Sequence, residues 1–334
     1  MSSKLRVLAL CGFAQNAWVF SKHMAGIQKA CPDVEFVFLD PPVVLKHADF
    51  RETLAVLNSP LVLDERGLDD PQTAPRAWWR FGPDNKEYYE AARGRMTGFD
   101  EAIAYLHAYL SHNPPFDGVL GFSQGGVAAT LLCAMISNPN LHPSFPASEA
   151  IVPFKFLITC GSFIPYTVHH FAPQFVPYFP LPAELTSLHI IGKNDIIVRE
   201  ESSRNLAAHC LNSRVECHEG GHFVPRKANW RAFFNAYLSS FLPGGTNGHG
   251  IPPPIAFQTH IKGCPSHLLT PPHTPTSSSS GATFPSDTNS ENGTSFTDTD
   301  IETHDWSISV NNAKPRACWH VGTYVKAEKA RFRF

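Results

Sequence analysis

One serine stands in a sequence context that could activate it as a nucleophile. Ser123 is the centre of Gly121-Phe122-Ser123-Gln124-Gly125, which lies between an apolar run and a helical pattern. Gly-x-Ser-x-Gly between a strand and a helix is typical of a nucleophile elbow, a sharp turn that presents the serine hydroxyl at the end of a sheet. The helix N-terminus also directs amide N–H groups toward that position. The alternative is a glycine-rich turn with an incidental serine.

A serine nucleophile needs a base that takes its proton and an acid that orients the base. In a strand–elbow–helix arrangement these partners follow in the order Ser, Asp or Glu, His. After Ser123 the next aspartate along the chain is Asp195, which directly follows an apolar run. We expect Asp195 to be the orienting acid. Helix capping is its alternative role, and Glu200 and Glu201 are the fallback acids.

The sequence around each histidine distinguishes the candidates for the base. Of the next three histidines, His209 falls within a helical pattern and His218 within or at the end of a predicted strand. His222 lies in Glu219-Gly220-Gly221-His222, a glycine-bent loop that could return over the sheet edge. An imidazole titrates near neutral pH, as a general base should. We therefore expect His222 to be the base, with a surface loop histidine as the alternative.

Acyl transfer also requires donors for the oxyanion that develops on the substrate. One expected donor is the backbone N–H of Gln124, the residue after the nucleophile. The other should come from the loop that follows the first strand, most simply the N–H of Phe13. Because the donors are backbone N–H groups, the side-chain types in these two segments give little information about the assignment.

The substrate pocket is predicted from two insertions. Residues 163–179 are rich in aromatic side chains broken by prolines, and they read as a wall or lid for an apolar acyl group, or equally as a second layer of core. Trp78 and Trp79 could line the same pocket or pack in the core. Neither of these segments offers a cluster of Arg or Lys, which favours an uncharged or mildly polar acyl ester over a phosphorylated substrate. The candidate pocket residues are Trp78, Trp79, Phe163, Tyr166 and Phe171.

These side chains need a sheet that brings them to one edge. Apolar runs alternate with helical patterns through the first 242 residues, which indicates a mostly parallel sheet covered by helices on both faces, an α/β fold. Two irregular insertions are expected at 41–96 and 162–184. The predicted strands are Leu5–Leu10, Val34–Leu39, Gly118–Phe122, Phe156–Cys160, Leu188–Ile191 and Val215–His218, and the predicted helices are about 17–30, 99–112, 125–137, 199–211 and 227–241.

The composition changes near Pro243. Residues 243–334 are rich in Pro, Gly, Ser and Thr, and the stretch LTPPHTPTSSSS has neither helical nor strand periodicity. Such a segment buries too little apolar surface to offset the entropy of ordering it. We expect one serine hydrolase domain over 1–242 and a disordered tail over 243–334.

Several classes of function are disfavoured by composition. The chain has 334 residues with 43% hydrophobic and 17% charged residues, and its formal net charge of −2 provides no strong field for nucleic acid or anionic membrane. No apolar run is long enough to span a bilayer. Its eight cysteines form no C-x-x-C pair. We expect a reduced, cytoplasmic protein without a metal or other cofactor.

Taken in order, the segments CGFAQN, RAWW, FDGVLGFSQGG, GKNDIIV and EGGHFVP resemble the FSH family of serine hydrolases, which is common in fungi and belongs to the α/β-hydrolase superfamily. The resemblance covers about residues 4–242 and implies the same catalytic residues, Ser123, Asp195 and His222. GFSQGG alone is also similar to acyl-protein thioesterases and carboxylesterases. Cys11 is a departure, because such sequences usually have His before that glycine.

The resemblance implies an esterase or thioesterase acting on a hydrophobic acyl ester or thioester. Several relatives lie beside fungal polyketide synthases, so an acyl carrier protein or a polyketide synthase is an expected partner. Two alternatives are an acyl-protein thioesterase or carboxylesterase of general metabolism, and a non-catalytic scaffold that binds a hydrophobic ligand. A cysteine enzyme using Cys11 or Cys133 lacks a paired histidine.

Overall fold

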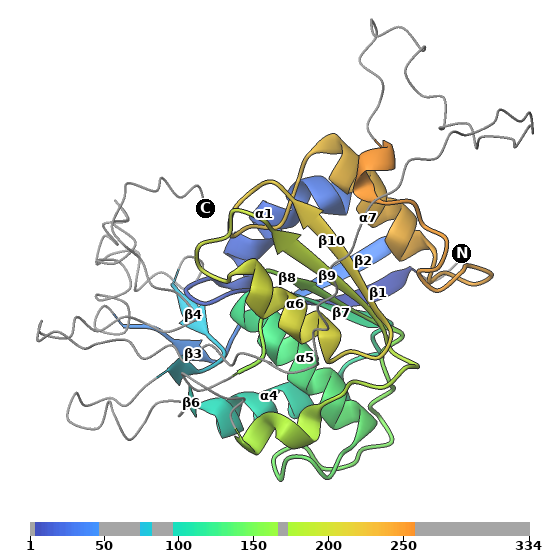
Figure 1. The fold of residues 1–334 in the computed structure, drawn as a ribbon. Coiled ribbons are helices and arrows are strands. Elements are labelled where there is room, and N and C mark those ends of the chain that lie inside the picture. The colour runs from blue at the N-terminus through green and yellow to red at the C-terminus, as the bar shows by residue number, and fades with distance from the viewer. Residues whose placement is uncertain (1–3, 47–73, 82–95, 166–172, 258–334) are drawn as a thin grey trace, which may run out of the picture. The chain divides into compact units, whose positions relative to one another are not determined.

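The computed structural model describes residues 4–46, 74–81, 96–165 and 173–257 of the chain. Its centre is a parallel sheet of six strands in the order β10-β9-β8-β7-β1-β2. The inner strands are almost wholly buried, as parallel strands covered on both faces must be. Figure 1 shows this twisted sheet between two groups of helices. The strands are β1 (Leu5–Leu10), β2 (Val34–Leu39), β7 (Gly118–Phe122), β8 (Phe156–Cys160), β9 (Thr186–Gly192) and β10 (Ser213–His218).

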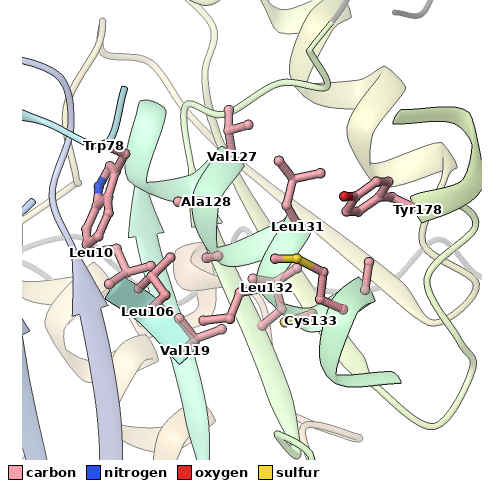
Figure 2. Close-up of a cluster of buried hydrophobic side chains, with 14 of the residues drawn as sticks. Leu10, Trp78, Leu106, Val119, Val127, Ala128, Leu131, Leu132, Cys133 and Tyr178 are labelled. Atoms are coloured by element: carbon pink, nitrogen blue, oxygen red, sulfur yellow. The ribbon is translucent and has the colours of Figure 1, made fainter. Parts of the chain in front are cut away.

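Helices cover each face of the sheet. On one face, α1 (Ala17–Ala30) and α7 (Ala228–Ser239) contribute Phe20, Met24, Phe233 and other residues to a core over Val7 and the alternate positions of the strands. On the other face, α4 (Phe99–His112), α5 (Gln124–Ser137) and α6 (Glu200–Ala208) bury a larger cluster, part of which Figure 2 shows. No helix in the described ranges is long and apolar enough to cross a membrane.

The predicted elements match the structure closely, and the expected α/β fold with a mostly parallel sheet flanked by helices is confirmed. The helices expected at about 199–211 and 227–241 end earlier, at Ala208 and Ser239. Two strands begin earlier, where polar residues precede the apolar run. β9 begins at Thr186 and β10 at Ser213, so both start before the apolar runs that indicated them. The described parts of the first insertion add two short antiparallel pairs: β3 (Val43–Val44) with β4 (Arg76–Ala77), and β5 (Arg80–Phe81) with β6 (Met96–Thr97).

The chain beyond the predicted boundary at Pro243 is partly described. Residues 243–257 continue from α7 and end in η3 (Pro254–Phe257), which packs back on α7 through the rings of Phe257 and Phe233. Arg214 Nη1 of β10 donates to the carbonyl oxygen of Ile251 at 2.7 Å. The folded domain therefore extends to at least Phe257, past the boundary that composition indicated. The rest of the predicted tail, 258–334, lies outside the described residues.

Candidate active site

Ser123 occupies a sharp turn between β7 and α5. Its backbone has φ 52° and ψ −120°, a region that non-glycine residues rarely adopt outside strained functional turns. The turn is possible because the neighbouring glycines allow backbone contact: a Cβ added at Gly121 would lie 2.3 Å from the Gly125 carbonyl oxygen, and one at Gly125 would lie 2.2 Å from the Leu10 carbonyl oxygen. The structure thus forms the predicted elbow at the carboxyl end of β7.

Asp195 and His222 form a close pair. His222 Nδ1 lies 2.7 Å from Asp195 Oδ2, and the two side chains are 12% and 1% exposed. The other carboxylate oxygen, Oδ1, accepts the N–H groups of Ile197 and Val198, each at 2.9 Å. One oxygen therefore caps the turn before α6, while the other holds the imidazole. Asp195 does not cap the helix, because the N-cap residue of α6 is Arg199; its second oxygen stabilises the turn that precedes the helix.

The pair lies beside the elbow. The His222 ring contacts the ring of Phe122, the residue before the serine, with centroids 4.7 Å apart. A Cβ added at Gly161, at the end of β8, would lie 3.0 Å from His222 Nδ1 and 3.1 Å from Asp195 Oδ2. Among the described residues no hydrogen bond joins the Ser123 hydroxyl to His222. Such catalytic bonds often form only once substrate is bound.

The loop that carries His222 is fastened to the loop that carries Asp195. Asn194 donates from its backbone N–H to the Gly220 carbonyl oxygen at 3.0 Å and from Nδ2 to the Glu219 carbonyl oxygen at 2.8 Å. His218 supports the same loop, since its Nδ1 accepts the Gly220 N–H at 3.1 Å. The acid and the base are therefore carried on one hydrogen-bonded unit.

The other candidate bases have structural roles. Burial lowers the pKa of His218 to about 4, although the charges of Asp195 and Glu219 act in the opposite direction. Its ring packs against Phe223 and Trp230. His209 follows α6, where its Nδ1 bonds to a backbone carbonyl oxygen. His222 contacts Asp195 and the ring of Phe122, and its role as the base stays a prediction.

The predicted oxyanion donors lie on the two segments that meet at the elbow. The Gln124 N–H is at the first position of α5 and has no intrahelical acceptor. In the loop after β1, the Gly12 N–H is engaged by Gln15 Oε1 at 3.1 Å. That contact removes Gly12 as a donor and leaves the assignment of Phe13 in place as a prediction.

The predicted pocket residues lie mostly in the core. Trp78 and Trp79 are fully buried, and Figure 2 shows Trp78 above Leu10 within the larger core cluster. Phe163 is 6% exposed. The structure therefore places these three side chains in packing positions, the alternative that the sequence left open, and not along an open wall. Tyr166 and Phe171 lie outside the described residues.

Two features near the serine were not predicted from the sequence. One is the contact of the Phe122 ring with His222, and the other is the hydrogen bonding of the Gln124 side chain to Trp78 and Trp79. A signal for the second was present: Gln124 is a polar residue in an otherwise apolar and glycine-rich stretch, and a buried amide must find partners.

Two buried cysteines are poor candidates for a nucleophile. Burial raises the pKa of the thiols of Cys11 and Cys133, which disfavours the nucleophilic thiolate. Within the described ranges, no group of three His, Cys, Asp or Glu side chains could hold a metal ion.

One protein family and several known proteins resemble much of this chain. The family model described as "Serine hydrolase (FSH1)" matches residues 1–234. "Esterase OVCA2" of Mus musculus is 29% identical over 240 residues, which cover 71% of this chain and 96% of that protein. The protein named "Dihydrofolate reductase" of Schizosaccharomyces pombe is 30% identical over 249 residues but matches over 48% of its length. Among solved structures, Zea mays acyl-protein thioesterase 2 has a TM-score of 0.43 and 16% identity over 67% of this chain and 89% of that one.

Proposed function

Because the chain belongs to the FSH1 family of serine hydrolases, we propose that it hydrolyses a carboxylic ester or thioester through an acyl-enzyme on Ser123. The observation that carries this proposal is the 2.7 Å pair between Asp195 and His222, set beside a serine in a strained strand-to-helix turn. These are the three residue types of a Ser–His–Asp triad. They follow one another along the chain as Ser, Asp and His, which is the usual order in this fold.

The reaction begins with attack by the serine. Ser123 Oγ forms a bond to the acyl carbonyl carbon as the C=O π electrons move to oxygen, and His222 Nε2 takes the hydroxyl proton. Asp195 holds Nδ1–H and stabilises the imidazolium. The oxyanion accepts hydrogen bonds from the backbone N–H groups of Gln124 and Phe13.

Collapse of the tetrahedral intermediate breaks the bond to the leaving group. His222 gives its proton to the departing alcohol or thiol, and Ser123 is left as an ester. A water molecule then attacks this ester with His222 as base, which releases the carboxylic acid and restores the serine. A thioester carbonyl is already activated, so the same residues handle both substrate classes.

We propose that the substrate carries an apolar acyl group. The residues next in sequence to the acid and the base, Ile196 and Phe223, expose 41% and 44% of their surface. Exposed large apolar side chains next to Asp195 and His222 favour a substrate with a hydrophobic group. We also keep the narrower proposal that the acyl donor is a carrier-bound or polyketide product, which rests on the family resemblance alone.

The proposal is tested by hydrolysis assays on matched substrates. Oxygen esters and thioesters with the same acyl chain, free and attached to an acyl carrier protein, are offered to the wild type and to Ser123→Ala. We expect Ser123→Ala to lose turnover by a factor on the order of 10⁵ or more. Ser137→Ala, at the other end of α5, is the control and should retain it.

The pattern of outcomes separates the proposals. A wild-type preference for the carrier-bound thioester would support the narrower proposal, and equal turnover of free esters would contradict it. Turnover that survives Ser123→Ala would overturn the nucleophile assignment. Absence of turnover on every substrate would favour a non-catalytic scaffold.

A further inference from the structure

The side chain of Gln124 is tied to a distant segment of the chain. Its Oε1 accepts the Trp78 N–H at 3.0 Å and its Nε2 donates to the Trp79 carbonyl oxygen at 2.8 Å. The carboxamide thus meets one donor and one acceptor of the same backbone stretch, and this fixes its orientation. Gln124 is 2% exposed, and both tryptophans are fully buried. Hydrogen bonds in such a position resist competition from water.

The same backbone stretch also holds the loop after β1. Trp78 Nε1 donates to the carbonyl oxygen of Cys11 at 3.0 Å, and the Arg76 N–H donates to the carbonyl oxygen of Gln15 at 3.2 Å. Gln15 in turn accepts the Gly12 N–H through Oε1. The loop that carries Phe13 is therefore fastened on both sides of that residue.

We propose that Trp78 and the Gln124 side chain are positioning groups that fix the two halves of the oxyanion hole relative to each other. This proposal rests on the proposed function. One half, the Gln124 N–H, belongs to α5, and the other, the Phe13 N–H, belongs to the loop after β1. Residues 76–79 are hydrogen-bonded both to the Gln124 side chain and to the loop after β1. We call these four residues the bracket, because they connect the two halves of the oxyanion hole.

The bracket matters because oxyanion stabilisation depends on the position of its donors. Donors must lie about 3 Å from the oxygen of the tetrahedral intermediate, and a misplacement of 1 Å costs about a hundredfold in rate. The two backbone segments are already in close contact, since a Cβ at Gly125 would lie 2.4 Å from the Cys11 carbonyl oxygen. A small shift of the loop after β1 would change the gap between the two donors, while the hydrogen bond between Asp195 and His222 lies on other loops.

Two variants remove hydrogen bonds of the bracket, one on the side of Gln124 and the other on the side of the loop after β1. Gln124→Met keeps the length of the side chain and removes both hydrogen bonds to residues 78 and 79. Trp78→Phe keeps an aromatic ring in the core and removes the indole N–H that binds the Cys11 carbonyl oxygen. The matched control is Tyr237→Phe, which also deletes one polar atom from a fully buried aromatic residue; the Tyr237 hydroxyl has no hydrogen-bond partner among the described residues.

The measurement compares transition-state binding with substrate binding. We measure kcat and KM for an ester, and Ki for a trifluoromethyl ketone that bears the same acyl chain and forms a tetrahedral adduct with the serine. All rates are expressed per site labelled to completion by a fluorophosphonate, so that unfolded protein does not contribute. We expect kcat/KM to fall by about tenfold to a hundredfold in Gln124→Met and by about tenfold in Trp78→Phe.

The bracket predicts that Ki rises in both variants by the factor by which kcat/KM falls, while KM stays within about twofold of wild type. The Tyr237→Phe control should change none of these values. Variants whose kcat/KM per labelled site matches wild type would overturn the proposal, as would a fall in kcat/KM that leaves Ki unchanged. A wild-type protein that takes no label would instead overturn the proposed function, and this proposal with it.

Discussion

A buried histidine should make the stability of this domain sensitive to mild acid. His189 of β9 is 1% exposed, and its ring nitrogens are bonded to Thr159 Oγ1 at 2.8 Å and to Ser187 Oγ at 3.1 Å. These partners are hydroxyl groups, and none is an anion that would balance an imidazolium. Burial accordingly lowers the pKa of His189 from its ordinary value of 6.5 to about 4.

The sign and the size of the effect follow from linkage. Between pH 6.5 and 4 the unfolded chain binds a proton at His189 that the folded chain does not, so the free energy of unfolding falls as the pH is lowered through this window. For a shift of this size the loss from His189 is about 2 kcal/mol between pH 7 and pH 5, and it levels off near 3 kcal/mol below pH 4. His218, whose pKa burial also lowers to about 4, adds to the same trend.

Urea unfolding at pH 7 and pH 5 measures this loss. We compare wild type with His189→Asn, whose amide can bond to the same hydroxyl groups but does not take up a proton. The variant should lose about 2 kcal/mol less than wild type between the two pH values. His112→Gln, which replaces an exposed histidine at the end of α4, should behave as wild type. Equal losses in wild type and His189→Asn would show that His189 does not cause the acid sensitivity.

Two further predictions concern the site and the domain end. In Gly161→Ala the added methyl group would lie 3.0 Å from His222 Nδ1, at a backbone φ of 51° that disfavours alanine, so kcat should fall by about a hundredfold; a kcat within a factor of about three of wild type would contradict this. A chain that ends after Leu242 lacks the η3 segment that packs on α7, so it should melt at a lower temperature than one that ends after Phe257. Equal melting temperatures would place the boundary at 242 after all.

Most strands and helices of the fold could be predicted from local sequence patterns. β7 and β8 read as apolar runs because both of their faces are buried, and the elbow could be located because its glycines must permit backbone contact. The pairing of Asp195 with His222 could be anticipated because parallel strands end at the same sheet edge.

Contacts between segments remote in sequence could not be predicted in this way. Gln124 and Trp78 are joined across 46 positions, and Thr159 and His189 across 30. A single sequence does not reveal which polar residues meet inside a core. The tryptophans were for this reason considered as pocket walls, although aromatic residues of their size are also typical of cores. The end of the domain was placed too early because residues 243–257 have a loop-like composition and yet pack on α7.

In the proposed reaction Ser123 is the nucleophile and depends on His222 as its base. The direct measurement is peptide mapping by mass spectrometry after reaction with a fluorophosphonate, in wild type and in His222→Ala. We expect one phosphonylated peptide, modified at Ser123, whose formation slows by at least about a thousandfold in His222→Ala. A label on any other residue, or labelling of Ser123 at the same rate in both proteins, would contradict it.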